Sequence, residues 1–75
     1  MLTYEQALEK AKAIKPQINR YCEFKGAYAF SFDDGPADGG ESPVVILKDT
    51  GEALNFVSYA TKHGSELVRE FGPLR

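Results

Sequence analysis

The sequence lacks several features that commonly stabilise or localise a small protein. A single cysteine cannot form an intramolecular disulfide, and one cysteine with one histidine is too few for the usual structural zinc site. No apolar run approaches the roughly 20 residues that cross a membrane as a helix. A chain of 75 residues must therefore be stabilised by its own core, by self-association, or by both.

An excess of charge of one sign is also absent. The formal net charge is −2, and the charged residues are mixed along the chain. Nucleic acids need a basic face and anionic membranes attract polybasic segments, so we expect neither as a partner. The first residues include acidic side chains and lack the apolar stretch of a signal peptide. Together with the lone cysteine, these features predict a cytoplasmic protein.

The N-terminal segment carries the strongest local signal for a helix. Thr3 and Gln6 have the spacing of a capping box, in which each side chain bonds the backbone N–H of the other residue. Pro16 should end this helix near Lys15, because proline disfavours helical backbone in the residue before it. The apolar helical phase continues beyond the proline, which predicts a second short helical turn. The residues on this phase are Tyr4, Ala7, Leu8, Ala11, Ile14, Ile18, Tyr21 and Cys22.

Two further segments have the pattern of β-strands. In residues 27–32, small side chains (Ala or Ser) alternate with large aromatic ones. A strand with this pattern has one bulky face and one face of small side chains. The small face could admit a closely packed helix or could face solvent. Residues 44–47, Val-Val-Ile-Leu, are apolar at every position, so we expect this strand to be interior in the sheet and covered on both faces.

A hairpin should join residues 44–47 to a third strand over 53–57, because Gly51 supplies the positive φ of a tight turn. A three-residue loop at 49–51 would place Lys48 opposite Glu52 at the tip of the hairpin. A two-residue turn at 50–51 would shift the pairing by one residue. We prefer the first register, because it pairs opposite charges and gathers large side chains on one face. That face would carry Val44, Ile46, Leu54 and Phe56.

The C-terminal segment 65–71 has the signals of a short helix. Ser65 is a suitable N-cap, an apolar stripe follows it, and Gly72-Pro73 would stop the helix. Residues 58–64 fit either the end of a strand or a helical turn closed by Gly64. The predicted fold of residues 1–75 is one small α+β domain, with an N-terminal helix packed on a three-stranded antiparallel meander and a short C-terminal helix.

The acidic, glycine-rich segment 33–42 is the most conspicuous candidate for a ligand site. Its carboxylates, on Asp33, Asp34, Asp38 and Glu41, do not have the spacing of a calcium loop. A phosphate loop is also disfavoured, because a strand rather than a helix follows and the acidic charge would repel the anion. We interpret the segment as a connector between strands that could also contact a basic partner.

No combination of residues predicts catalysis, a cofactor or a metal. Cys22 and His63 could in principle form a thiol–imidazole pair, but nothing in the sequence brings them together, and a lone cysteine is usually a small core residue. The aromatic residues Tyr28, Phe30 and Phe32 could stack on bases, but no basic residues are interleaved with them. Core packing is the favoured role of these aromatic side chains.

The segments "AIKPQINRYCEFKGAYAFSF" and "PVVILKDTGEALNF" together resemble a group of short bacterial proteins with no assigned function. The shared features are a capped helix, a Lys-Pro break, an aromatic strand, a Gly-rich loop and a hairpin with Thr-Gly-Glu at its tip. The resemblance implies an α+β fold and brings no catalytic or ligand residues. The hairpin alone is also similar to those of PepSY-like domains and small toxin-immunity proteins.

The sequence predicts a non-enzymatic module that binds another protein or a second copy of itself. The hypothesis depends on surplus apolar surface over the sheet and on the acidic segment, because exposed apolar patches commonly mark protein interfaces. An alternative is a toxin-immunity-type inhibitor, in which the acidic segment, Glu66 and Glu70 oppose a basic toxin. A small metal-binding protein is a third hypothesis. The predicted interaction surface comprises Asp33, Asp34, Asp38, Glu41, Val45, Leu47 and Val57.

Overall fold

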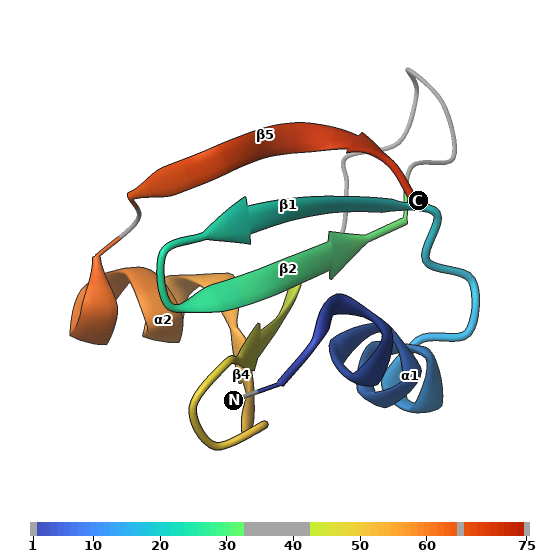
Figure 1. Ribbon diagram of the computed structural model, residues 1–75, viewed down its shortest axis with the longest axis horizontal. Helices are drawn as coiled ribbons and strands as arrows, with labels where there is room; N and C mark the ends of the chain where they lie inside the picture. The colour runs from blue at the N-terminus through green and yellow to red at the C-terminus, as the bar shows by residue number, and fades with distance from the viewer. Residues whose placement is uncertain (1, 33–42, 65, 75) are drawn as a thin grey trace.

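The described part of the chain forms a five-stranded antiparallel sheet with one helix packed on each face (Figure 1). The computed structural model describes residues 2–32, 43–64 and 66–74. The elements in chain order are α1 (Tyr4–Ile14), β1 (Arg20–Phe24), β2 (Ala27–Ser31), β3 (Val44–Leu47), β4 (Ala53–Asn55), α2 (Phe56–His63) and β5 (Leu67–Pro73). The α+β class and the packing of the N-terminal helix on the sheet are therefore confirmed.

The sheet has two more strands than the sequence predicted. The strand order is β4-β3-β2-β1-β5, so β1 to β4 form a meander and β5 joins at the far edge, beside β1. The chain reaches that edge through α2, which starts directly after β4. A second helix is present, as expected, but it occupies residues 56–63. The predicted helix over 65–71 is wrong, because residues 67–73 are β5.

Helix α1 forms as its capping signals predict. The Thr3 hydroxyl accepts a hydrogen bond from the Gln6 N–H, and the Gln6 side chain accepts one from the Thr3 N–H. The helix ends at Ile14, just before Pro16. Its apolar face covers the bulky side of the sheet, where Tyr4 lies edge-on to Tyr21 and Tyr28. This core contains Tyr4, Ala7, Ala11, Ile18, Tyr21, Tyr28, Phe30, Val44 and Ile46.

Residues 20–24 form a strand, which corrects the prediction that Tyr21 and Cys22 extend a helical phase. Only Pro16 and Gln17 form a turn, and β1 then pairs with β2 through the two-residue connection Lys25-Gly26. Pairing places Tyr21 against the α1 face of the sheet and Cys22 against the opposite face, and both are buried. As a strand, this segment buries successive side chains in the cores on the two faces of the sheet. This burial decides its conformation, although the spacing of its apolar residues also fits a helix.

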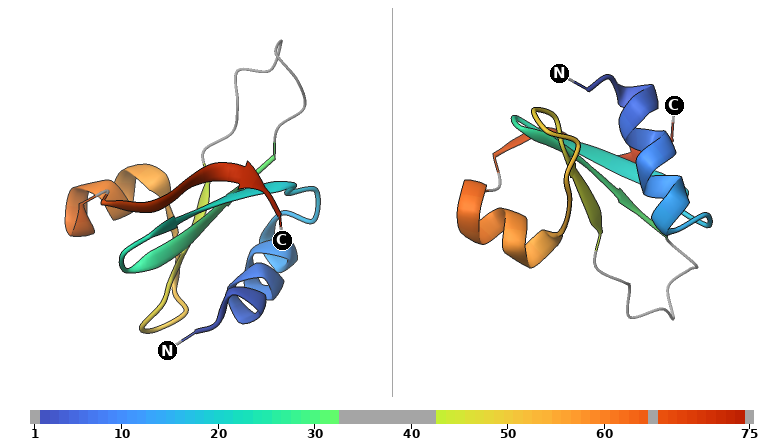
Figure 2. Two further views of the ribbon diagram at one scale, coloured as in Figure 1. Left: turned by 45° about the horizontal axis from the view of Figure 1, so that its top comes forward. Right: turned by 90° about the horizontal axis from the view of Figure 1, so that it is seen from below.

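Strand β3 is interior and buried on both faces, as the Val-Val-Ile-Leu run predicts. It pairs with β2 on one side and β4 on the other. Figure 2 shows α1 and α2 on opposite faces of the sheet. The second face of the sheet is thus covered by α2. The small face of β2 lies in this second core, whose members are Cys22, Phe24, Ala27, Ala29, Val45 and Tyr59.

The β3–β4 hairpin has a different register from the preferred one. Val45 lies opposite Leu54, and the connection is a four-residue turn in which the Gly51 N–H donates to the Leu47 carbonyl over 2.9 Å. Gly51 has φ +77°, as a tight turn requires. Lys48 does not oppose Glu52. Its Nζ instead lies 2.7 Å from Oε2 of Glu23 on β1.

Candidate functional site

Strand β5 presents an exposed apolar surface at the edge of the sheet. Leu67, Val68 and Phe71 are 50%, 60% and 41% exposed. One side of β5 pairs with β1, with two register shifts, and the other side is the edge of the sheet. The opposite edge strand, β4, has only three residues. Within its seven residues, β5 carries three exposed apolar side chains beside the charged pair Arg69-Glu70, so this edge offers both apolar contacts and charges to a partner.

The residues predicted to form an interaction surface do not gather in one place. Val45 is fully buried, so the expectation that it supplies exposed apolar surface is wrong. Leu47 is half-buried and packs against the second core, whereas Val57 on α2 is 67% exposed. The four acidic residues Asp33, Asp34, Asp38 and Glu41 lie outside the residues that the structure describes.

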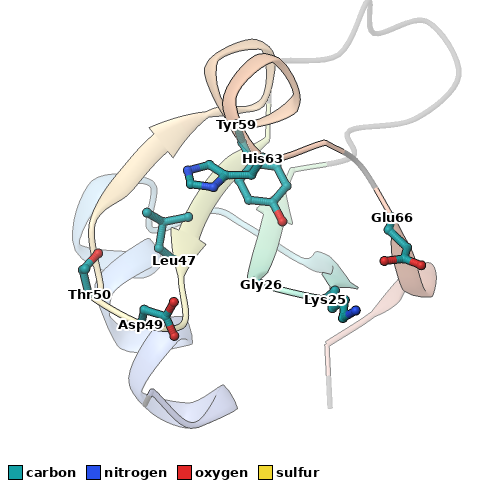
Figure 3. A pocket seen from close by; sticks show the side chains of 8 residues that line it. All are labelled: Lys25, Gly26, Leu47, Asp49, Thr50, Tyr59, His63 and Glu66. Carbon is teal, nitrogen blue, oxygen red and sulfur yellow. The ribbon is translucent and has the colours of Figure 1, made fainter.

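A cleft of about 340 Å³ lies beneath α2, where two turns of the sheet meet the helix (Figure 3). The β1–β2 turn, the end of β3 with its following turn, α2 and the residue before β5 all contribute to it. The backbone N–H of Lys25 donates to the Glu66 carbonyl, which ties the start of β5 to the β1–β2 turn at the rim. The lining residues are Lys25, Gly26, Leu47, Asp49, Thr50, Tyr59, His63 and Glu66.

Tyr59 forms the inner wall of this cleft. Its side chain is 3% exposed, and its ring centroid lies 5.1 Å from that of Phe24. The hydroxyl points into the cleft, toward Lys25 and Gly26 (Figure 3). No described residue hydrogen-bonds to it, although the oxygen is not sealed from the cleft. The His63 ring stacks on Tyr59, with centroids 5.3 Å apart, and holds the ring from the side of α2.

Charges of both signs surround the cleft. Lys25, Asp49 and Glu66 are exposed, and none of them forms an ion pair or side-chain hydrogen bond with another described residue. In Figure 3, Asp49 lies on one side of the opening, and Lys25 and Glu66 lie on the other. The cleft therefore combines an apolar wall, formed by Leu47 and the Tyr59 ring, with charged side chains that have no partner among the described residues.

Of the other chemical candidates from the sequence, Cys22, Tyr28 and Phe30 lie in the core and His63 lies on the surface. Cys22 is buried, and desolvation raises the pKa of its thiol from 9.0 to about 11, so the thiol is protonated at neutral pH. His63 is exposed on α2 and contacts Tyr59. Phe30 is fully buried and Tyr28 nearly so, both beneath α1. The sequence missed β5, because residues 65–71 were assigned to a helix, and it missed the role of Tyr59, because residues 58–64 were left open between a strand end and a helical turn. The helical alternative is the correct one.

In comparisons with protein-family models, curated proteins and solved structures, none matches this chain. Across the described ranges, no three side chains of His, Cys, Asp or Glu gather where they could hold a metal ion. None of the helices in the described part of the chain is long and apolar enough to span a membrane.

Proposed function

We propose that the protein is a non-enzymatic binding module and that β5 is its docking element. An extended segment of another protein pairs with the outer edge of β5 and adds a sixth strand to the sheet. The single observation that supports this function is the exposed apolar edge formed by Leu67, Val68 and Phe71. Strand addition gains main-chain hydrogen bonds along the edge and covers apolar side chains at the same time.

A second copy of the chain is a poorer occupant than a different protein. In a two-fold dimer of antiparallel strands, one residue lies opposite its own copy. The register that uses all of Leu67–Pro73 is centred on Glu70, so two glutamates would face each other. The next register opposes two copies of Arg69. Like charges directly opposite each other destabilise strand pairing.

A segment of a different protein can place opposite charges across from Arg69 and Glu70. An acidic residue opposite Arg69 and a basic residue opposite Glu70 would form cross-strand pairs, each worth roughly 0.2–1 kcal/mol. Apolar residues on either side of this charged pair would contact Val68 and Phe71. Because the strands are antiparallel, the matching segment reads Lys-Glu in its centre, and the reversed order Glu-Lys opposes like charges.

Synthetic seven-residue peptides test this function directly. Two peptides have identical composition, with branched apolar residues flanking either a central Lys-Glu or a central Glu-Lys. Titration into ¹⁵N-labelled full-length protein should shift the β5 amide resonances, with tighter binding for Lys-Glu. Equal binding of both peptides, or shifts confined to other elements, would refute docking on β5.

Two matched substitutions test whether the peptide binds at β5. Val68→Thr exchanges a methyl for a hydroxyl on β5, and Val57→Thr makes the same change at the exposed position on α2. We expect the first to weaken peptide binding about fivefold, since burial of this side chain contributes on the order of 1 kcal/mol. The second should leave the affinity unchanged. Equal effects of the two substitutions would argue against β5 as the docking element.

The toxin-inhibitor alternative stays a prediction, because its acidic segment lies outside the described residues. It differs from strand addition in its response to salt. Association steered by opposite charges weakens steeply as ionic strength rises, whereas apolar strand addition changes little. A partner protein whose affinity falls steeply between low and high NaCl would support the inhibitor alternative, whereas a partner that stays bound in high NaCl would support strand addition.

A further inference from the structure

We propose that the cleft beneath α2 binds a zwitterionic small molecule of amino-acid size with an apolar side chain. This inference goes beyond the proposed function and uses a different surface. The volume of about 340 Å³ lies at the lower end of the range for small-molecule sites, roughly 300–1,000 Å³. Such sites combine an apolar wall with a few converging polar groups, as this cleft does.

The Tyr59 hydroxyl is the strongest sign of a ligand. Tyrosine side chains that are buried usually direct the hydroxyl to a hydrogen-bond partner. Tyr59 is 3% exposed, yet no described residue bonds its hydroxyl, which points into the cleft. A ligand oxygen placed there would accept a hydrogen bond from the hydroxyl.

The charges around the cleft determine which end of the ligand lies where. Lys25 lies on the side toward which the Tyr59 hydroxyl points, so these two groups can bind a carboxylate together (Figure 3). Glu66 lies on the same side as Lys25 and can bind the ammonium group, which an α-amino acid carries on the carbon next to the carboxylate (Figure 3). Leu47 and the Tyr59 ring form the apolar wall of the cleft and can contact the ligand's side chain. Glu66 beside Lys25 would repel ligands with a second negative charge, such as phosphates.

The ligand class is tested with leucine and two analogues that each lack one charged group. 3-Methylbutylamine lacks the carboxylate, and 4-methylpentanoate lacks the ammonium group. In titrations of ¹⁵N-labelled full-length protein, leucine should shift the amide resonances of Gly26, Tyr59 and His63. Each analogue should bind about tenfold more weakly, because one charge-assisted contact is lost. Equal binding of an analogue and leucine, or no binding of leucine, would overturn the proposal.

Tyr59→Phe separates a binding role from a structural one. This substitution removes only the hydroxyl, which has no protein partner among the described residues, so the urea midpoint of unfolding should not change. Leucine affinity should fall about tenfold. Tyr28→Phe is the matched control, because it removes a hydroxyl beneath α1 on the other face of the sheet. Unchanged affinity in Tyr59→Phe, or an equal loss in the control, would contradict the assignment.

Discussion

The ion pair between Lys48 and Glu23 ties the β3–β4 turn to β1 across the end of β2. The Lys48 Nζ lies 2.7 Å from the Glu23 Oε2 and 4.8 Å from the centroid of the Tyr28 ring. The two charged side chains are only 11% and 18% exposed. A pair held in this way should contribute measurably to stability, unlike most ion pairs on protein surfaces.

The expected loss of stability lies between the values for fully exposed and fully buried ion pairs. Exposed pairs contribute about 0–1 kcal/mol, and loss of one partner from a fully buried pair costs about 3–5 kcal/mol. Because both Lys48 and Glu23 retain some exposure, we expect Lys48→Met or Glu23→Gln to cost about 2 kcal/mol. The coupling energy between the two substitutions should be about 1 kcal/mol, after allowance for screening by solvent.

A double-mutant cycle measured by urea unfolding tests this estimate. The four proteins are the parent, Lys48→Met, Glu23→Gln and the double variant. A control cycle replaces Glu23→Gln with Glu52→Gln, because Glu52 is exposed and lies next to the same turn. We expect additivity in the control cycle. A coupling energy of zero in the first cycle, or equal coupling in both, would refute the argument from burial.

Two further predictions concern stability. Gly51→Ala should cost about 1–2 kcal/mol in thermal or urea unfolding, because alanine is strained at φ +77°. The new Cβ would also lie 3.0 Å from Lys10 Cε, whereas Gly72→Ala meets nothing within 4 Å and should be nearly neutral. Burial raises the pKa of the Cys22 thiol from 9.0 to about 11, so the folded state holds this proton to higher pH than the unfolded chain does. The resulting stabilisation is complete below pH 9 and should fall, on the order of 2 kcal/mol, as the pH rises to 11. The difference in unfolding free energy between parent and Cys22→Ala should narrow over this interval, and a constant difference would contradict the assignment.

The elements that the sequence predicted correctly are those with local causes. The Thr3–Gln6 capping box defines the start of α1, and the alternation of residues 27–31 defines β2. The uninterrupted Val-Val-Ile-Leu run could only be satisfied by burial on both faces of a sheet. In each case the signal lies within one element or its immediate flank.

The errors concern segments whose conformation depends on distant partners. Residues 67–71 have helical spacing in isolation, but pairing with β1 decides their structure. Phe56 and Val57 were assigned to the third strand, although they begin α2, and Asn55 at the end of β4 caps this helix by accepting the Ser58 N–H over 2.7 Å. The cleft could not be foreseen, because Tyr59 meets Lys25 and Asp49 only after α2 has packed on the sheet.

The place of β5 in the sheet also has a consequence for folding kinetics. The β1–β2 hairpin closes through two residues, so its partners can meet within about 1–10 μs. Leu67 must find Phe24 over a much longer span, and the entropy of closing a loop rises with its length. We therefore expect β5 to join the sheet after the meander and to detach from it before global unfolding. Amide hydrogens of β5 should accordingly exchange with deuterium faster than those of β2.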